Sequence, residues 1–218
     1  MAVNFGTRLI INFTNTAMAA ANPLNWHHVE RMAEYCRANR RWRDLLIILI
    51  PCTSGYRHSD WAELKWVDVL GKDSIKKVEQ KTDKHRTAPL NAYVKAAILQ
   101  AYEGILATIP PSKRGAMKND YIFKPESHNS KSGVMTRAGV NSVLERIRTA
   151  VGIEHTVTVH SLRKAYGMRL YGLMGETESA MIWVSNWFGH SSLQVTQRYL
   201  GLEAKLKMEV MDQMWANG

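Results

Sequence analysis

The side chains with the most chemical potential are histidines and arginines at short spacings in the second half of the chain. His160 and Arg163 stand three residues apart in VHSLRKAYG, where an extended pattern becomes helical at His160. On a helix the two side chains share one face, which puts a titratable imidazole beside a fixed cation. Guanidinium matches phosphate oxygens with two parallel hydrogen bonds, and imidazole moves a proton near neutral pH. The pair is explained either by a phosphate ligand or by a helix start with an incidental histidine.

A second group lies in the segment GHSSLQVTQRY, which runs from Gly189 to Tyr199. His190 at a helix start lies beside backbone N–H groups that favour an anion. Nine residues on one straight helix turn through about 900°, so His190 and Tyr199 would point to opposite faces. They can meet at one site only if the chain bends or breaks between them, or if a mobile segment delivers Tyr199. Taken alone, Tyr199 is more simply explained as a half-buried anchor of its helix.

Arg57 follows Gly55 in TSGYRHSDWAEL, where one predicted helix ends and the next begins. Glycine permits a tight turn there, from which the arginine projects. By itself Arg57 is more simply explained by an ion pair with a carboxylate. Carboxylates, histidines and cysteines do not occur at metal-ligand spacing, and the adjacent His27 and His28 diverge on a helix. We therefore expect no metal and no cofactor.

The elements that must hold these residues follow from apolar periodicity, caps and turn residues. Helices are expected near residues 25–39, 42–54, 58–66, 91–109, 136–151, 160–174, 178–187 and 191–199. Short strands are expected within 67–90, with turns at 71–73 and 82–84, and a brief one at 121–123. The predicted fold class is α+β: mostly α-helical, with one small antiparallel sheet of about three strands. We divide the chain into an N-terminal arm (1–23), a main domain (24–200) and an amphipathic C-terminal tail (201–218).

Length and charge limit the class of protein. The 218 residues suit one domain, and 29 Lys and Arg against 19 Asp and Glu give a net charge of +10. Such an excess favours a polyanionic partner, most often nucleic acid. Two cysteines make no disulfide framework, which fits a reducing cytoplasm. The longest apolar run, 45–51, is far too short to span a membrane, and the N-terminus has no signal-peptide pattern.

Five segments appear in a specific order: Gly-x-Arg, Glu-Leu-x-Trp-x-Asp, KTDK in a predicted hairpin, His-x-x-Arg, and Gly-His with a tyrosine nine residues later. Over roughly residues 24–200 this order resembles the catalytic domain of the tyrosine recombinases of the phage integrase family. The resemblance implies the DNA breaking–rejoining fold and a catalytic site made of Arg57, Lys81, His160, Arg163, His190 and Tyr199. The chain departs from the usual pattern at Asp60, Ser161 and Phe188, where Glu, Asp and Leu are common. None of these departures removes a reacting group, but Asp60 and Ser161 could alter how the arginines are held.

The resemblance also implies a mechanism without metal or ATP. Tyr199 is the nucleophile that forms a 3′-phosphotyrosine, and Lys81 is the general acid for the 5′-oxygen. His160 accepts or relays the tyrosine proton, while Arg57, Arg163 and His190 stabilise the phosphate. Removing one such donor typically slows catalysis by about 10²–10³-fold. Further DNA contacts are expected from Lys84, Arg86 and Lys164.

The implied function is site-specific recombination (integration, excision or inversion) by a bacterial or phage protein in the cytoplasm. The implied partners are a double-stranded recombination site, three further copies in a homotetramer on DNA, and an accessory DNA-bending factor, with a monomer when free. The tail docks either on its own domain or on a neighbouring protomer. Two rival functions are a type IB topoisomerase and a catalytically silent DNA-binding regulator.

The chain is short for the family, whose full-length members carry an N-terminal helical domain that closes around DNA. It is either a fragment or a relative of the short recombinases that invert promoter segments. Without that clamp, we expect the isolated chain to bind DNA weakly and with strong salt dependence.

Overall fold

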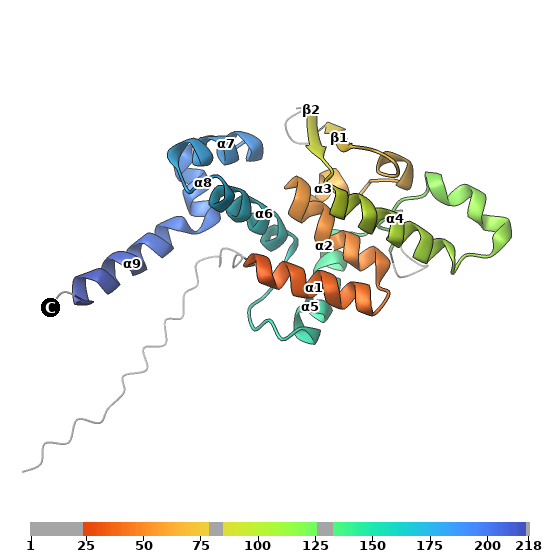
Figure 1. The fold of residues 1–218 in the computed structure, drawn as a ribbon, viewed down its shortest axis with the longest axis horizontal. Coiled ribbons are helices and arrows are strands. Elements are labelled where there is room, and N and C mark those ends of the chain that lie inside the picture. The colour runs from red at the N-terminus through yellow and green to blue at the C-terminus, as the bar shows by residue number, and fades with distance from the viewer. Residues whose placement is uncertain (1–23, 79–84, 126–132, 217–218) are drawn as a thin grey trace, which may run out of the picture.

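The computed structural model describes residues 24–78, 85–125 and 133–216. The expected arm at 1–23 and the turn at 82–84, with Lys81 and Lys84, lie outside these residues. The described elements, labelled in Figure 1, are α1 (Trp26–Ala38), α2 (Trp42–Ser54), α3 (His58–Trp61), η1 (Trp66–Asp68), β1 (Ser74–Val78), β2 (His85–Pro89), α4 (Ala92–Leu106), η2 (Pro111–Asn119), α5 (Arg137–Ala150), α6 (Val159–Leu173), α7 (Glu178–Phe188), α8 (Leu193–Leu200) and α9 (Leu202–Ala216).

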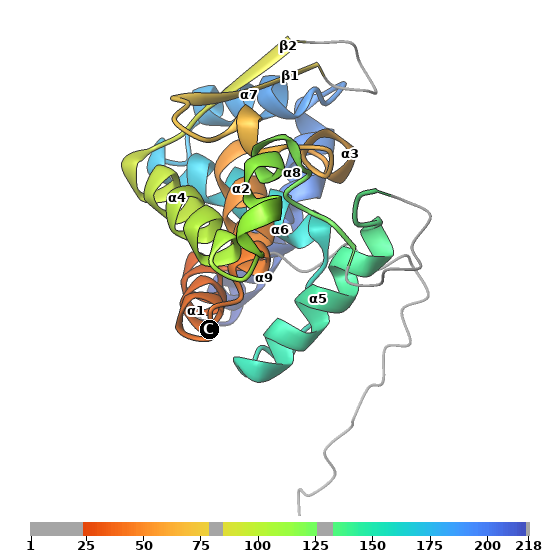
Figure 2. The same ribbon diagram turned by 90° about the vertical axis from the view of Figure 1, so that its right-hand side faces the viewer.

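Helix α2 forms the centre of the core. Its residues from Leu45 to Ile50 are all buried, and it packs against α1, α4 and α6. A helix that is apolar on every side requires neighbours all around it, which explains this central place. Figure 2 shows α1, α4 and α6 arranged about α2. The C-terminal end of α2 at Ser54 is thereby fixed, and Arg57 lies in the short loop that follows it.

The sheet is a single antiparallel hairpin in the described part of the chain, with a register from Ser74 opposite Pro89 to Val78 opposite His85. Two strands are therefore present there instead of about three. The strand expected at 121–123 is an isolated bridge between Lys65 and Tyr121. The bridge cannot extend into a ladder because η1 begins at Trp66 and turns the chain away.

Gly55 and Tyr56 join α2 to the hairpin. Gly55 ends α2 with a left-handed backbone (φ 64°), and its N–H donates to Pro51 O at 2.9 Å. The Tyr56 hydroxyl donates to the carbonyls of Ile75 and Arg86, each 3.0 Å away, on the two strands. The hairpin is thus tied to the loop that carries Arg57.

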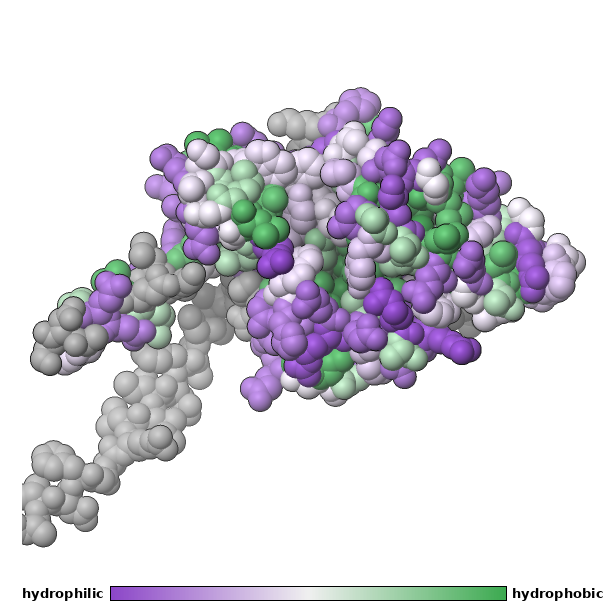
Figure 3. All heavy atoms as spheres, in the orientation of Figure 1, coloured by the Kyte–Doolittle hydropathy of each residue, from purple (hydrophilic) through white to green (hydrophobic). Residues whose placement is uncertain are grey.

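The C-terminal helices form a second, smaller core of Met181, Val184, Phe188 and Leu200. After Leu200, Gly201 takes a left-handed backbone (φ 80°) and α9 begins. Helix α9 contacts α8 and extends away from the body (Figure 1). Figure 3 shows hydrophobic and hydrophilic side chains side by side on it. In the described part of the chain, no helix has the length and apolar character needed to cross a membrane.

We expect Gly55→Ala to lower the free energy of unfolding by about 2–4 kcal/mol, because strain from positive φ adds to a steric clash. A Cβ at Gly55 would lie 2.5 Å from Cδ1 of Tyr166. Gly71→Ala is the matched control: its φ is 66°, but nothing lies within 4 Å of the added Cβ. It should lose only about 1 kcal/mol. Denaturant unfolding measures both, and equal losses would contradict the packing argument.

Candidate active site

Two arginines from distant segments meet at one carbonyl oxygen. The Nη2 atoms of Arg57 and Arg163 donate to Phe188 O at 3.1 and 3.2 Å. Arg163 also donates to Gly55 O. Phe188 is the last residue of α7, where the helix dipole places partial negative charge that attracts cations. The carbonyl therefore holds two guanidinium groups side by side.

The start of α6 positions His160 and Arg163. Ser161 Oγ accepts from the Thr158 N–H at 3.2 Å, and Asn141 Oδ1 accepts from the Val159 N–H at 3.1 Å. Arg163 is 4 % exposed, and its guanidinium carbon lies 4.3 Å from the centre of the Phe188 ring. His160 and Arg163 both line one cleft, as their spacing predicts.

Asp60 and Ser161, which depart from the usual family pattern, both accept hydrogen bonds from backbone N–H groups. Asp60 is 3 % exposed, and its Oδ2 accepts from the Arg57 N–H at 3.0 Å. Ser161 is fully buried and caps α6. Each side chain therefore fixes the segment from which a cleft arginine projects.

His190 and Tyr199 converge because the chain breaks between them. Helix α7 ends at Phe188, Gly189 takes a left-handed backbone (φ 63°), and α8 begins only at Leu193. His190 therefore lies in the turn, and its ring centre is 5.1 Å from that of Tyr199, edge to face. The predicted break is confirmed. His190 Nδ1 lies 2.9 Å from Thr196 Oγ1, which leaves Nε2 for the cleft.

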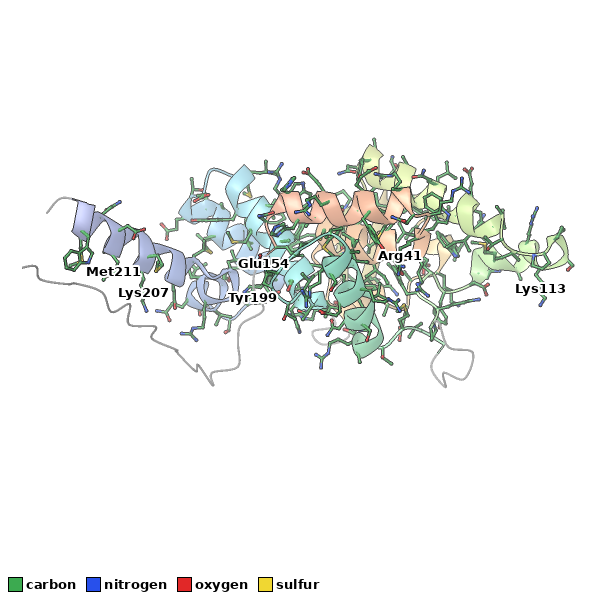
Figure 4. All side chains as sticks on the ribbon, turned by 90° about the horizontal axis from the view of Figure 1, so that it is seen from below. Arg41, Lys113, Glu154, Tyr199, Lys207 and Met211 are labelled. Atoms are coloured by element: carbon green, nitrogen blue, oxygen red, sulfur yellow. The ribbon has the colours of Figure 1, made fainter. Side chains whose placement is uncertain are left out.

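These side chains surround a cleft of about 420 Å³. It is lined by Tyr56, Arg57, His58, Ser59, Arg137, Val159, His160, Arg163, His190 and Tyr199. The structure thus brings together all the predicted catalytic residues except Lys81, which lies outside the described residues. Figure 4 shows Tyr199 where the body of the molecule meets the C-terminal helices.

Burial and nearby arginines determine the protonation of the cleft. Burial, then Arg163, Arg57 and Arg86, lowers the pKa of His190 to about 4. Burial and then Arg137, Arg163 and Lys164 lower the pKa of His160. Burial raises the pKa of Tyr199, against the opposing effects of Arg163 and Arg57. At neutral pH both imidazoles are therefore uncharged, and the phenol keeps its proton.

The two described residues expected to contact DNA are both largely buried. Arg86 is 8 % exposed, with its guanidinium carbon 5.5 Å from the centre of the Trp187 ring. Lys164 is 3 % exposed, with Nζ 5.7 Å from the centre of the Tyr199 ring, and burial lowers its pKa. Their DNA contacts, like that of Lys84, stay predictions.

Three residues of this region did not stand out in the sequence. Thr196 is fully buried on α8 and orients His190. Arg137 begins α5, far along the chain from the other cleft residues, and no local pattern indicates it. His58 follows Arg57 directly, and that adjacency was a usable signal. Among the described residues, no group of three or more His, Cys, Asp or Glu side chains could hold a metal ion.

A model of the phage integrase family matches residues 23–205. The chain belongs to this family. It is 26% identical over 196 residues to tyrosine recombinase XerS of Streptococcus equi subsp. equi, covering 86% of this chain and 52% of the relative. It is 27% identical over 157 residues to tyrosine recombinase XerD of Listeria innocua serovar 6a, covering 72% of this chain and 49% of the relative. The chain thus spans about half the length of these relatives.

Solved structures show the same fold. The XerH recombinase bound to palindromic difH substrate, a post-cleavage complex, matches with a TM-score of 0.62 and 25% identity, covering 90% of this chain and 54% of that one. The XerA recombinase matches with a TM-score of 0.61 and 20% identity, covering 88% and 65%. The predicted family and the mostly helical fold with one small antiparallel sheet are confirmed.

We expect stability to fall as pH drops from about 6.5 towards 4, partly through His190. Its pKa is about 4 when folded and 6.5 for the free side chain, so the unfolded state binds more protons between these values. The contribution is complete above pH 6.5 and is lost as pH falls towards 4.

Denaturant unfolding from pH 4 to 7.5 measures this loss. His190→Asn keeps a polar atom near Thr196 but does not titrate, so its stability should vary less with pH. His27→Asn, on the exposed His27 of α1, is the matched control. Parallel curves for the wild type and His190→Asn would contradict the interpretation.

Proposed function

We propose that residues 24–200 form the catalytic domain of a site-specific DNA recombinase, with 201–218 as an assembly tail. It cuts and rejoins DNA through a 3′-phosphotyrosine without metal or ATP. The observation that carries the proposal is the cleft in which Tyr199 faces two guanidinium groups held on one carbonyl. Guanidinium and phosphate are matched in charge and geometry.

The scissile phosphate binds first between Arg57 and Arg163. Its two non-bridging oxygens accept hydrogen bonds from these side chains, which are already oriented, so little reorganisation is needed when negative charge develops. His190 Nδ1 lies 2.9 Å from Thr196 Oγ1, and we take it as the acceptor of that hydrogen bond, so that the imidazole hydrogen is on Nε2. His190 then donates a third hydrogen bond to the phosphate.

Tyr199 next attacks the phosphorus. A bond forms between its Oη and phosphorus as the bond from phosphorus to the 5′-oxygen breaks. Because burial keeps the phenol protonated, a proton acceptor is required, and the neutral His160 takes that role. Lys81 gives a proton to the leaving 5′-oxygen. Attack by a second 5′-hydroxyl on the phosphotyrosine reverses the step and rejoins the strand.

The proposed partner is a double-stranded recombination site, and the net charge of +10 supports it. We further propose a homotetramer on DNA and a monomer when free. The observation that favours assembly is α9, where Met208, Met214 and Trp215 are 63%, 68% and 81% exposed. Large apolar side chains exposed along one helix are typical of a docking element. Exchange between duplexes by such an assembly distinguishes a recombinase from a topoisomerase.

The catalytic prediction is tested with a nicked duplex selected from a randomised pool by covalent capture on the wild-type protein. In EDTA, we expect a covalent protein–DNA adduct with the wild type and none with Tyr199→Phe, which removes the attacking oxygen. Gel electrophoresis under denaturing conditions measures the adduct. An adduct that requires magnesium, or that forms with Tyr199→Phe, would sink the mechanism. Relaxation of supercoiled DNA without recombinant product would favour the topoisomerase.

The assembly prediction uses Met211→Asp and Met214→Asp together. Both positions are on α9 and are 50% and 68% exposed, and Figure 4 shows Met211 well apart from the cleft residue Tyr199. We expect adduct formation to stay within about twofold of wild type while strand exchange and the slowest gel-shift species fall at least tenfold. Lys207→Asp is the control for added negative charge. Unchanged strand exchange would rule out a role for this helix in assembly.

A further inference from the structure

The cleft has a second cationic end beyond the two arginines on Phe188. Its volume of about 420 Å³ falls in the range of about 300–1,000 Å³ that holds ligands much larger than one phosphate group. Besides the predicted residues, it is lined by His58 at the start of α3 and Arg137 at the start of α5. None of the residues that line it is acidic.

Arg137 lines the cleft together with His58 and His160. Burial and then Arg137 lower the pKa of His58, and burial, Arg137, Arg163 and Lys164 lower that of His160. The pKa of His190 and that of Tyr199 respond instead to Arg163 and Arg57. The cleft therefore carries positive charge at Arg137 as well as at the two arginines on Phe188.

His58 shares the cleft with Arg137 and is held by two contacts. Its ring packs edge-on against Trp61, with centres 5.0 Å apart and planes at 77°. A hydrogen bond with the Met135 backbone ties it to the residues just before α5. Its Nε2 atom is buried and has no hydrogen-bond partner in the described part of the chain. A buried polar atom without a partner is costly, and because His58 lines the cleft, an anion bound there would satisfy Nε2 once the ring turns towards it.

We propose that Arg137 and His58 form a second phosphate subsite, which binds a phosphate adjacent to the scissile one on the same DNA strand. This inference rests on the proposed function. Each DNA strand carries a phosphate about every 3.4 Å along the helix axis, so a strand seated on Arg57 and Arg163 brings a neighbouring phosphate alongside. Arg137 donates two hydrogen bonds to that phosphate. The added negative charge favours proton uptake by His58, which then donates from Nε2.

The subsite positions the reacting phosphate. A strand held at two successive phosphates cannot rotate about the first, so the scissile phosphorus stays in line with Tyr199. Arg137 is thus a positioning residue for the cleavage step. Loss of its contact should slow adduct formation by about 10–100-fold, the usual range for a hydrogen bond to a charged group.

The test combines protein variants with DNA in which one phosphate is replaced by an uncharged methylphosphonate. The selected nicked duplex carries this group at the position on either side of the scissile phosphate. Wild type, Arg137→Ala and His58→Asn are compared by rate of adduct formation, with Arg114→Ala, an exposed arginine on η2, as the control for loss of one charge. Circular dichroism and thermal unfolding confirm that the variants are folded.

Arg137→Ala and His58→Asn should each slow cleavage of natural DNA. At one of the two positions the methylphosphonate should slow the wild type by a similar factor and cause no further loss in Arg137→Ala. The subsite would be overturned if the loss from the methylphosphonate added to the loss from Arg137→Ala at both positions. It would also be overturned if only a changed base pair, and neither methylphosphonate, abolished the difference in rate between wild type and Arg137→Ala. An equal rate for wild type and Arg137→Ala on natural DNA would overturn it too, while an absent wild-type adduct would instead refute the proposed function.

Discussion

The site depends on a single carbonyl oxygen. Phe188 O accepts hydrogen bonds from Arg57, which follows α2, and from Arg163, which belongs to α6. Two guanidinium groups at this spacing repel each other, and a neutral carbonyl at a helix C-terminus offsets only part of that repulsion. The arrangement is therefore held by the surrounding packing. An anion that carries two oxygens on one atom would offset the remaining repulsion between the two guanidinium groups.

The side chain of Phe188 is as important as its carbonyl. The ring contacts Arg163, His190 and Tyr199, with ring centres 5.4 Å from each of the last two. It fits only because Gly167 in α6 has no side chain, since a Cβ there would lie 2.7 Å from the ring. Phe188, which spaces the cations, thus also holds Tyr199, the proposed nucleophile, and the smaller hydrophobic core and the cleft are one unit.

The sequence predicted the features that depend on local spacing. Caps and periodicity indicated most helices, and helical geometry showed that His190 and Tyr199 could meet only across a bend or break or through a mobile segment. The spacing of His160 and Arg163 predicted their common face. Features that depend on tertiary contact were missed: a phosphate-compatible arginine such as Arg137 looks like any exposed residue until α5 packs beside α6. The predicted third strand at 121–123 is absent although its local pattern was adequate, because η1 interrupts the pairing between Lys65 and Tyr121.

The cleft combines positively charged arginines with uncharged imidazoles, and the two features depend on the same surroundings. Arginine remains charged in any protein environment, whereas burial and the arginines keep the imidazoles neutral. Acidic neighbours would neutralise the arginines and raise the histidine pKa values, so their absence from the lining serves both needs. In the proposed mechanism, a bound phosphate supplies the missing negative charge and shifts the histidines towards proton uptake. The proposed substrate would thereby make His160 a better base at the moment when Tyr199 must lose its proton.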